Sequence, residues 1–308
     1  MKRMNITTEE LAKLCGVSQG TVDRALHGRC EISEATRARI LEAAGRYGYR
    51  AAPLAPDEIR TIGVIVFNLK NEYFNRLITE LEAELRRRGC FMSVMFTEYD
   101  AKAELEAVKR FDSMGAQGII ICPTNTSDEF GKYLSYLALP CVAVGNPLRY
   151  VTQVGIDDRR AMYEQTLTVL DGNYEKLVYY SPALEYQNFK NAQSLRFDGF
   201  MQAVTEAGFE RFEICRSLEA VKETYAEKCA VICSTDRYAL DAYLKNRDAD
   251  IIGFDGIISD TKPKLPIASV EYSYKAIAAA AADAVLKVTH EERIIIPHRT
   301  VGVISRKT

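Results

Sequence analysis

Residues 4–49 read MNITTEELAKLCGVSQGTVDRALHGRCEISEATRARILEAAGRYGY, and the apolar spacing of this stretch predicts three short amphipathic helices. Thr7 can cap the first helix, with Glu10 three residues later completing a capping box. Gly16 can take the left-handed conformation that ends this helix. The stretch therefore contains a complete short helix followed by a tight turn.

The next two helices follow the same rules, with Ser18 and Ser33 as their caps. The expected inner positions are Leu11 and Leu14, flanked by Ala12, in the first helix, Val22, Ala25 and Leu26 in the second, and Ile40, Leu41, Ala44 and Tyr47 in the third. The residues left facing outward on the second helix are Gln19, Gly20, Asp23 and Arg24. A helix, a glycine-containing turn and a helix with a polar outer face form the helix-turn-helix pattern.

The run L-A-x-x-C-G-V-S-x-G-T-V-D-R-A-L-x-G, followed by I-S-E-x-T-R-x-R-I and G-Y, closely resembles the DNA-binding head of LacI-type (lactose repressor family) transcription regulators. This resemblance implies that the second helix reads the major groove of double-stranded DNA. The alternative is a small three-helix unit that binds a protein. The residues expected to contact DNA are Thr8, Ser18, Gln19, Gly20, Thr21, Arg24, Ser33 and Thr36.

The polar face of the second helix sets what this head can read. Gln19 and Gly20 open the helix, and Arg24 is suited to guanine. Gly20 has no side chain, so it contributes little direct readout. Asp23 is unexpected near phosphates, and it either accepts a hydrogen bond from a cytosine amino group or pairs with Arg24.

Length and charge place this head in a larger protein. The 308 residues suffice for more than one domain, and 47% apolar and 27% charged residues are ordinary for a globular protein. Without a membrane-length apolar run or the apolar core of a signal peptide, a cytoplasmic location is expected. Residues 1–50 carry nine Lys and Arg against six Asp and Glu, and the remainder carries 31 against 36. The small positive excess of the head suits DNA but predicts that two heads are needed.

No catalytic or metal-binding pattern is present in the sequence. The eight cysteines form no CxxC pair and are expected to be reduced and buried. His27, His290 and His298 are isolated, and the HExxH, GxSxG, P-loop and GxGxxG motifs are absent. We therefore expect no enzyme activity, no cofactor and no metal. A cytosolic carbohydrate-active enzyme is the distant alternative, since an arginine and an aspartate across a cleft can serve catalysis.

Residues 51–60 form the expected linker. Regulators of the resembled family usually carry a hinge helix here, whose leucine enters the minor groove. In this chain Pro53 and Pro56 oppose a continuous helix, the segment is shorter by about one helical turn, and Leu54 is the candidate wedge. The sequence leaves open whether a hinge helix forms.

From Thr61 onward, apolar strands alternate with helices. The strands expected are TIGVIVF, CFMSVMF, GIIIC, PCVAVG, KLVYYS, FEIC, CAVICS, IIGF, IASV and RIIIPH, and the clearest helices cover 72–88, 103–114, 127–137, 160–170, 193–207 and 274–288. Continuous Val and Ile runs between helices predict parallel strands covered on both faces. The fold class is therefore an all-α helix-turn-helix head followed by an α/β body.

The body resembles the type I periplasmic sugar-binding fold, which implies two parallel-sheet lobes flanking a ligand cleft. Chain crossings are expected near Asp157, near Glu271 and just after Val288. The lobes are then residues 61–157 plus 272–290 and residues 158–271 plus 291–308. A ligand is expected between them, at the carboxyl ends of the strands.

Three segments carry the expected ligand contacts. N71-E-Y-F74 is similar to the family's Asn-x-aromatic-aromatic segment, although Phe74 also fits the core stripe of the following helix. S194-L-R-F-D-G-F200 matches R-x-x-G-F, so Arg196 resembles the ligand-binding arginine, the alternative being a salt bridge on the helix face. Asp255 in IIGFDG stands in the position of the family's ligand-binding aspartate, or else forms an Asx-turn.

Further contacts are expected at the edge of the same cleft. Thr235 in CSTDRYAL is a polar contact, and Asp236 is expected to cap the helix that follows. The family usually has Gln-Pro where this chain has Tyr272-Ser273. Tyr186, Phe189 and Asn146 lie in loops that can close over a ligand. The full set expected to bind ligand is Asn71, Tyr73, Phe74, Asn146, Arg196, Thr235, Asp255 and Tyr272.

The sequence therefore predicts a ligand-responsive transcription regulator, with repression as the expected mode of action. Arg196 and Asp255 favour a sugar or sugar derivative as effector, and the aromatic residues favour the alternative, a nucleobase or nucleoside. A homodimer on a near-palindromic operator is expected, because the chain shows no leucine heptad tail of the kind that makes some relatives tetramers.

Overall fold

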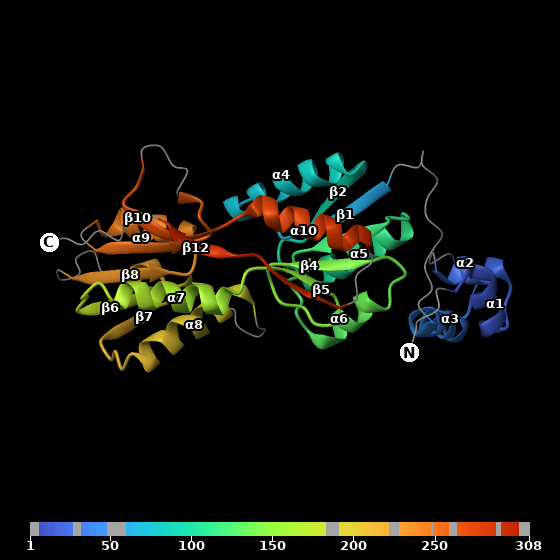
Figure 1. Ribbon diagram of the computed structural model, residues 1–308, viewed down its shortest axis with the longest axis horizontal. Coiled ribbons are helices and arrows are strands. Elements are labelled where there is room, and N and C mark those ends of the chain that lie inside the picture. Colours follow the sequence, from blue (N-terminus) through green and yellow to red (C-terminus); the bar gives the residue numbers. More distant parts are fainter. Residues whose placement is uncertain are drawn as a thin grey trace.

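The computed structural model describes residues 6–26, 32–47, 60–182, 191–221, 228–247, 249–258, 264–287 and 291–301. These residues form a helical head and an α/β body (Figure 1). The predicted linker up to residue 59, with Pro53, Leu54 and Pro56, lies outside the described residues, as do Tyr186 and Phe189. No helix in the described ranges is long and apolar enough to cross a membrane.

The described part of the head contains α1 (Thr8–Cys15), α2 (Gln19–Leu26) and α3 (Glu34–Tyr47). The predicted capping box of α1 is confirmed: the amide of Glu10 donates to the Thr7 hydroxyl at 3.3 Å, and the amide of Thr7 donates to the Glu10 carboxylate at 2.7 Å. Gly16 ends α1 with φ +61°, in the left-handed region that glycine adopts without strain.

The core of the head differs from the prediction at two positions. Leu11, Val22, Ala25 and Ile40 are fully buried, but Leu14 is 54% exposed and Tyr47 is 42% exposed. Ala12 and Cys15 complete the inner face of α1, which turns Leu14 toward solvent. Tyr47 is the last residue of α3 and lies outside the apolar core of the head. The described residues that form or pack against this core are Ile6, Leu11, Ala12, Cys15, Val17, Val22, Ala25, Leu26, Ile32, Ile40, Leu41, Ala43 and Ala44.

The first described sheet has six strands in the order β11-β5-β4-β3-β1-β2, with every neighbouring pair parallel. Its strands are β1 (Arg60–Val66), β2 (Cys90–Phe96), β3 (Gly118–Ile121), β4 (Cys141–Val144), β5 (Thr152–Gly155) and β11 (Arg293–Ile295). Its helices are α4 (Glu72–Arg87), α5 (Ala101–Ser113), α6 (Asp128–Ser135) and α10 (Tyr274–Lys287). Helices α4 and α10 pack together on one face, and the apolar residues of α5 and α6 cover the other.

The second described sheet has the order β12-β10-β9-β8-β6-β7, and only its β10–β12 pair is antiparallel. Its strands are β6 (Lys176–Tyr180), β7 (Phe212–Cys215), β8 (Cys229–Cys233), β9 (Asp250–Phe254), β10 (Ile267–Tyr272) and β12 (His298–Val301). Helices α7 (Asp158–Leu170) and α8 (Ala192–Glu206) pack against each other on one face. Helix α9 (Asp236–Lys245) and the short 3₁₀ helix η2 (Leu218–Ala220) contribute to the core of the other face.

The chain passes between the sheets three times within the described residues. It leaves the first sheet after β5, returns after β10, and crosses again between β11 and β12. The third crossing was predicted too early, just after Val288, because RIIIPH was interpreted as one strand. Pro297 interrupts that run, since proline cannot donate to a strand ladder. Ile294 pairs with Val154 in the first sheet, and His298 pairs with Tyr272 in the second.

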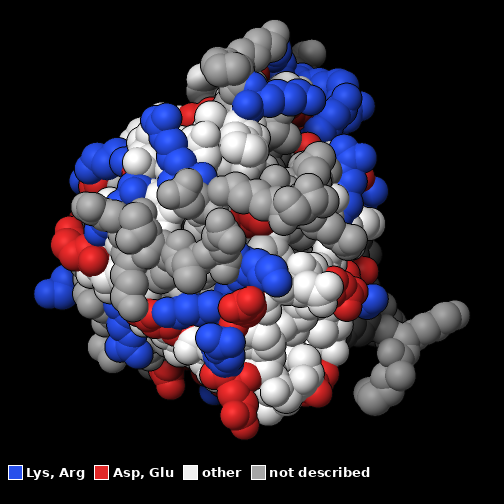
Figure 2. All heavy atoms as spheres, turned by 90° about the vertical axis from the view of Figure 1, so that its left-hand side faces the viewer, with Lys and Arg blue, Asp and Glu red and all other residues white. Residues whose placement is uncertain are grey.

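One further boundary differs from the prediction. Arg60 was assigned to the linker but is the first residue of β1, where it pairs with Cys90. The first lobe of the structure therefore contains β1 to β5, α10 and β11, and the second contains α7 to β10 and β12. Figure 2 shows the end of the second lobe, where Lys and Arg side chains are mixed with Asp and Glu over the described part of the face.

Gly199 permits the close packing of α7 against α8. A methyl group at this position would lie 2.2 Å from the carbonyl oxygen of Arg159. We expect Gly199→Ala to lower the free energy of unfolding by about 1–3 kcal/mol, because backbone must move to admit the methyl group. Urea unfolding followed by circular dichroism measures this change.

The matched control is Thr205→Ala, on an exposed position of the same helix, with an expected change within about 0.5 kcal/mol. Equal stability of the Gly199→Ala and Thr205→Ala proteins would contradict the close packing of α7 and α8.

Candidate functional site

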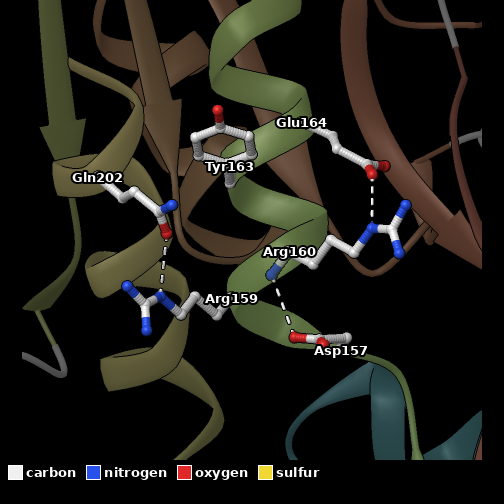
Figure 3. A pocket seen from close by; sticks show the side chains of 6 residues that line it. All are labelled: Asp157, Arg159, Arg160, Tyr163, Glu164 and Gln202. Carbon is white, nitrogen blue, oxygen red and sulfur yellow. Dashed lines mark hydrogen bonds and ion pairs between the residues drawn. The ribbon is translucent and has the colours of Figure 1, made fainter. Parts of the chain in front are cut away.

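A hollow on the surface of the second lobe lies between α7 and α8 (Figure 3). It has a volume of about 530 Å³. The side chains that line it satisfy one another: Arg160 Nε donates to Glu164 at 2.7 Å, and Arg159 Nε donates to Gln202 at 3.1 Å. Its lining side chains are exposed or half-exposed and paired with one another, and we do not assign the function to it.

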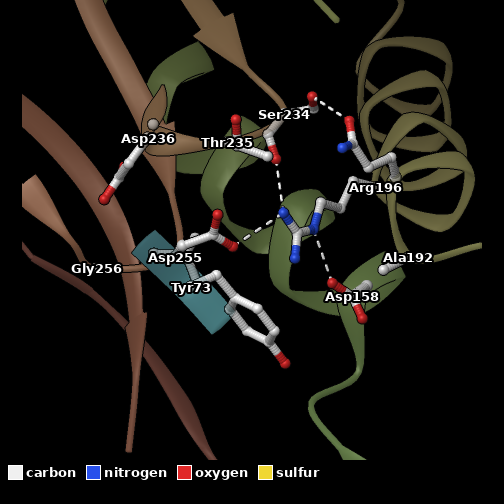
Figure 4. A network of polar contacts seen from close by, with 12 residues as sticks. Tyr73, Asp158, Ala192, Arg196, Ser234, Thr235, Asp236, Asp255 and Gly256 are labelled. Atoms are coloured by element: carbon white, nitrogen blue, oxygen red, sulfur yellow. Dashed lines mark hydrogen bonds and ion pairs between the residues drawn. The ribbon is translucent and has the colours of Figure 1, made fainter. Parts of the chain in front are cut away.

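The predicted pair Arg196 and Asp255 does come together, at the carboxyl end of the second sheet (Figure 4). Nη1 of Arg196 lies 3.1 Å from Oδ1 of Asp255 and donates to the carbonyl oxygen of Ser234 at 2.7 Å. Nε of Arg196 donates to Asp158 at 2.7 Å. Helix α8 supplies the arginine, while its partners come from the start of α7 and from the residues that follow β8 and β9.

The network is buried, and burial decides its electrostatics. Arg196 is 6% exposed, Asp158 is 4% exposed and Asp255 is 3% exposed. Burial on its own would lower the pKa of Arg196, but the two carboxylates raise it above the ordinary value, so the guanidinium stays charged. Burial raises the pKa of Asp255 to about 7, with Arg196 opposing the shift. The guanidinium carbon also lies 3.8 Å from the centre of the Phe254 ring, a cation–π contact.

Three tyrosines surround Asp255. The Tyr272 hydroxyl donates to Oδ1 of Asp255 at 3.0 Å, and the Tyr274 hydroxyl donates to its carbonyl oxygen at 2.8 Å. The ring of Tyr73, from α4 in the first lobe, lies 6.4 Å from the Tyr272 ring and 5.5 Å from the Tyr274 ring, measured between centres. Asp255 has φ +113°, a strained conformation for a residue with a side chain. Its surroundings therefore hold it in place at an energetic cost.

Asp236 was predicted to cap α9, and this prediction is wrong. The hydroxyl of Thr235 is the cap, accepting the amide of Tyr238 at 3.3 Å. Asp236 instead accepts the amides of Ile257 at 2.6 Å and Ile258 at 3.0 Å. A capping position is only one residue from the first helical turn, so the sequence could not separate the two roles. Asp236 thus fixes the loop that follows Asp255.

The other predicted ligand residues have structural contacts of their own. Oδ1 of Asn71 accepts the amide of Tyr73 at 3.0 Å and caps α4. Phe74 is 7% exposed and belongs to the apolar core, which fits the alternative that the sequence left open. Asn146 donates to the carbonyl of Pro123 at 2.8 Å and accepts the amide of Ala192 at 2.9 Å. Asn146 therefore joins the first lobe to the start of α8.

Sequence reasoning missed Asp158 and Arg76. Asp157 caps α7 by accepting the amide of Arg160, while Asp158 turns inward to Arg196. The doubled acid in GIDDR was the available signal, but it does not say which carboxylate faces inward. Nη2 of Arg76 donates to the carbonyl of Ile257 at 3.1 Å, a contact between lobes that no local pattern indicates.

In the head, some of the predicted DNA-contact residues stabilise helix starts, and others lie exposed on α2. Ser18 and Ser33 accept the amides of Thr21 and Thr36 at 3.1 and 3.3 Å, so these hydroxyls stabilise the starts of α2 and α3. Thr8 is the half-buried first residue of α1, and Gln19 and Gly20 are exposed on α2. Nε of Arg24 donates to the carbonyl of Gly20 at 3.0 Å. The side chain of Asp23 lies outside the described part of the chain.

Comparison with known proteins identifies the chain. Residues 59–301 match the family "Periplasmic binding proteins and sugar binding domain of LacI family", and residues 7–51 match "Bacterial regulatory proteins, lacI family". The chain belongs to the LacI family of transcription regulators. It is similar to catabolite control protein A of Priestia megaterium, with 25% identity over 96% of this chain and 98% of that protein.

Two solved structures share the fold. A LacI-family regulator from Silicibacter pomeroyi has a TM-score of 0.67 and 23% identity, with 98% of this chain and 100% of that chain covered. A periplasmic binding protein/LacI transcriptional regulator from Alkaliphilus metalliredigens QYMF, complexed with D-xylulofuranose, has a TM-score of 0.65 and 19% identity, with 79% and 97% covered. The predicted helix-turn-helix head and two-lobed body are confirmed.

Family membership also decides the class of function. The chain is a ligand-responsive DNA-binding regulator and not an enzyme, as the sequence predicted. LacI-family regulators bind operator DNA and small-molecule effectors, and they act in the cytoplasm. Within the described residues no group of three His, Cys, Asp or Glu side chains is arranged to hold a metal ion.

A buried carboxylate in the first lobe supports the junction between the lobes. Glu104 is fully buried and accepts the amides of Thr124 at 2.6 Å and Asn125 at 3.0 Å. These residues follow Pro123, whose carbonyl accepts from Asn146. Burial raises the pKa of Glu104 from 4.5 to about 7, with the two backbone hydrogen bonds opposing the shift.

This raised pKa makes the contribution of Glu104 to stability depend on pH. The folded protein keeps this proton up to about pH 7, while the unfolded chain loses it near pH 4.5. The contribution is therefore complete below pH 4.5 and is lost as the pH rises through 7. We expect the stability of the wild type, relative to Glu104→Gln, to fall by on the order of 2–3 kcal/mol between pH 5 and pH 7.5.

Urea unfolding of both proteins at four pH values measures this difference. A relative stability that rises with pH would mean that the carboxylate is buried charged, held by its two backbone donors.

Proposed function

We propose that this chain is a repressor whose operator affinity is changed by a neutral sugar or sugar derivative bound at the junction of the two lobes. The Arg196 network carries this proposal, because it holds a five-donor guanidinium between two carboxylates near the contact of α8 with the first lobe. Vicinal hydroxyls accept from the guanidinium and donate to a carboxylate at the same time. The similar regulator from Alkaliphilus metalliredigens is complexed with D-xylulofuranose, which agrees with a sugar-like effector.

A nucleobase or nucleoside is the second candidate, and the tyrosines favour it. The rings of Tyr73, Tyr272 and Tyr274 lie within 6.4 Å of one another between centres, and a planar base stacks on such faces. The polar network supports the sugar more strongly, since it offers separate donors and acceptors to several hydroxyls. A screen of both classes decides between them.

The proposed division of the chain assigns residues 1–50 to operator binding and residues 51–59 to the linker. The remainder is the ligand-binding and dimerisation domain. Its proposed ligand-contact residues are Asn71, Tyr73, Asn146, Arg196, Asp255 and Tyr272. We propose a homodimer, because a single head with a small positive excess binds a half-site weakly. Effector binding then changes operator affinity by favouring one of two arrangements of the lobes.

The DNA-binding part is tested by selecting double-stranded DNA from a random library with the full-length protein. We expect a near-palindromic site. Arg24→Ala should weaken binding to that site by about 1–3 kcal/mol and relax the base preference, because a bidentate base contact is lost. The matched control is Arg46→Ala, an exposed arginine of α3 paired with Glu42 at 2.8 Å, which should change neither. Non-specific binding that grows only with DNA length would refute the operator model.

The ligand-binding part is tested by thermal shift with D-ribose, D-xylose, D-glucose, adenine and guanosine. A compound present at a hundredfold over its Kd should stabilise the protein by about 2.7 kcal/mol. Arg196→Lys should abolish the shift, because lysine cannot form the parallel bonds of the guanidinium fork. A shift that survives in Arg196→Lys would place the ligand elsewhere. Sedimentation at micromolar concentration tests the dimer independently of any ligand.

A further inference from the structure

Tyr272 occupies a position that links the proposed ligand site to the lobe crossing. It is the last residue of β10, directly before the chain returns to the first lobe, and it is 5% exposed. Its hydroxyl donates to Asp255 Oδ1 at 3.0 Å. Tyr272 therefore contacts the centre of the proposed site.

We propose that the Tyr272 hydroxyl takes the place of an effector hydroxyl on Asp255, so that the Tyr272 ring stays packed beside Tyr73 of the first lobe and an effector binds by displacing Tyr272. This inference rests on the proposed function, since it concerns the same site. It names Tyr272 as the residue that determines which ligands enter. Three features of the site support this role: the hydrogen bond that Asp255 already accepts, the contacts of Tyr272 between the lobes, and the donors of Arg196 that stay available.

One of the two carboxylate oxygens that Asp255 can offer to an effector is already in use. Oδ1 of Asp255 receives the Tyr272 hydroxyl and faces Nη1 of Arg196 at 3.1 Å. Arg196 cannot give way easily, because Asp158 and the Ser234 carbonyl each hold it at 2.7 Å. Tyr272 contacts Oδ1 through a hydroxyl, which a ligand hydroxyl can replace like for like. A ligand hydroxyl that approaches Oδ1 therefore competes with Tyr272 and not with the arginine.

The same tyrosine belongs to the contact surface between the lobes. Its ring lies 6.4 Å from the ring of Tyr73, which comes from α4 of the first lobe. Close by, Arg76 of α4 donates to the Ile257 carbonyl of the second lobe at 3.1 Å. One apolar core cluster includes Phe74 of the first lobe and Phe254 of the second, with Tyr272 among its members. Displacing Tyr272 therefore weakens the packing that keeps the lobes together.

The donors left on Arg196 define the chemistry of the ligand. Among the described residues, no hydrogen bond reaches Nη2 of Arg196, and Figure 4 shows this nitrogen turned toward the side on which Tyr73 and Asp158 lie. A group that replaces the Tyr272 hydroxyl must donate to Asp255, and its neighbour can accept from Nη2. Two adjacent hydroxyls of a neutral polyol satisfy both. A phosphate or carboxylate brings no donor and is repelled by Asp158 and Asp255.

The conformational part of the proposal is tested without a ligand, by hydrogen–deuterium exchange of the full-length protein. Tyr272→Phe keeps the ring and removes the hydroxyl. We expect the amide of Ala192, which donates to Asn146 of the first lobe, to exchange about tenfold faster, as the loss of one hydrogen bond of about 1.4 kcal/mol implies. The increase should vanish when Tyr272→Phe is made in an Asp255→Ala background, because the partner is then already absent.

The matched control is Tyr174→Phe, which removes a tyrosine–aspartate hydrogen bond of 2.8 Å to Asp250 in the same lobe. It should leave exchange at Ala192 unchanged. If Tyr272→Phe leaves hydrogen exchange at Ala192 unchanged, or if Tyr174→Phe raises it equally, Tyr272 does not stabilise the contact between the lobes. This result is independent of DNA, so it is distinguishable from failure of the operator model.

The competition part uses calorimetry with D-ribose, D-glucose and D-glucose 6-phosphate. We expect Tyr272→Phe to bind at least one of the two neutral sugars roughly five- to tenfold more tightly than the wild type, because a larger fraction of molecules is binding-competent. Glucose 6-phosphate should bind neither protein. Equal or weaker sugar binding by Tyr272→Phe, tighter binding of the phosphate, or no binding of either sugar to either protein overturns the assignment of a neutral polyol.

Discussion

The buried charge of Arg196 is the constraint on which the body of this protein depends. A guanidinium with 6% exposure is tolerated only where its donors and its charge are matched. The match requires Asp158 at the start of α7, the Ser234 carbonyl after β8 and Asp255 after β9 to converge on one point of α8. Removing Arg196 leaves two buried carboxylates without their cation, so these four segments hold one another in place.

That convergence also explains the strain at Asp255. Its positive φ is unfavourable for a residue with a side chain, yet Arg196, Tyr272 and Tyr274 each bind it. Asp236 fixes the loop that follows through two backbone amides. The polar network and the tyrosines thus connect the chemistry of the site to the contact between the lobes. A ligand that exchanges contacts at Asp255 acts directly on the closure of the body.

Much of the fold was predictable, because local patterns carry it. The capping box of Thr7, the left-handed turn at Gly16 and the apolar runs of the parallel strands each depend on residues close in sequence. Predictions that depended on helix phase or on a chain crossing were less reliable. Leu14 proved exposed, and RIIIPH divides between two sheets at Pro297. Local sequence could not show this division, because Ile294 pairs with Val154, 140 residues earlier, and His298 pairs with Tyr272, 26 residues earlier. Asp236 serves a distant loop that a local capping rule cannot reveal.

By itself, the sequence determined the helix-turn-helix head, the alternation of strands and helices, and the pairing of Arg196 with Asp255 as candidates for one site. These follow from periodicity, capping chemistry and motif resemblance, which act over a few residues. Only the tertiary structure decided that Asp158 and not Asp157 faces Arg196. It alone also decided that Asn146 and Arg76 join the lobes and that the Tyr272 hydroxyl donates to Asp255. The physical reason is that a side chain's partner in a buried network is set by the packing of segments far apart in the chain, which no local pattern encodes.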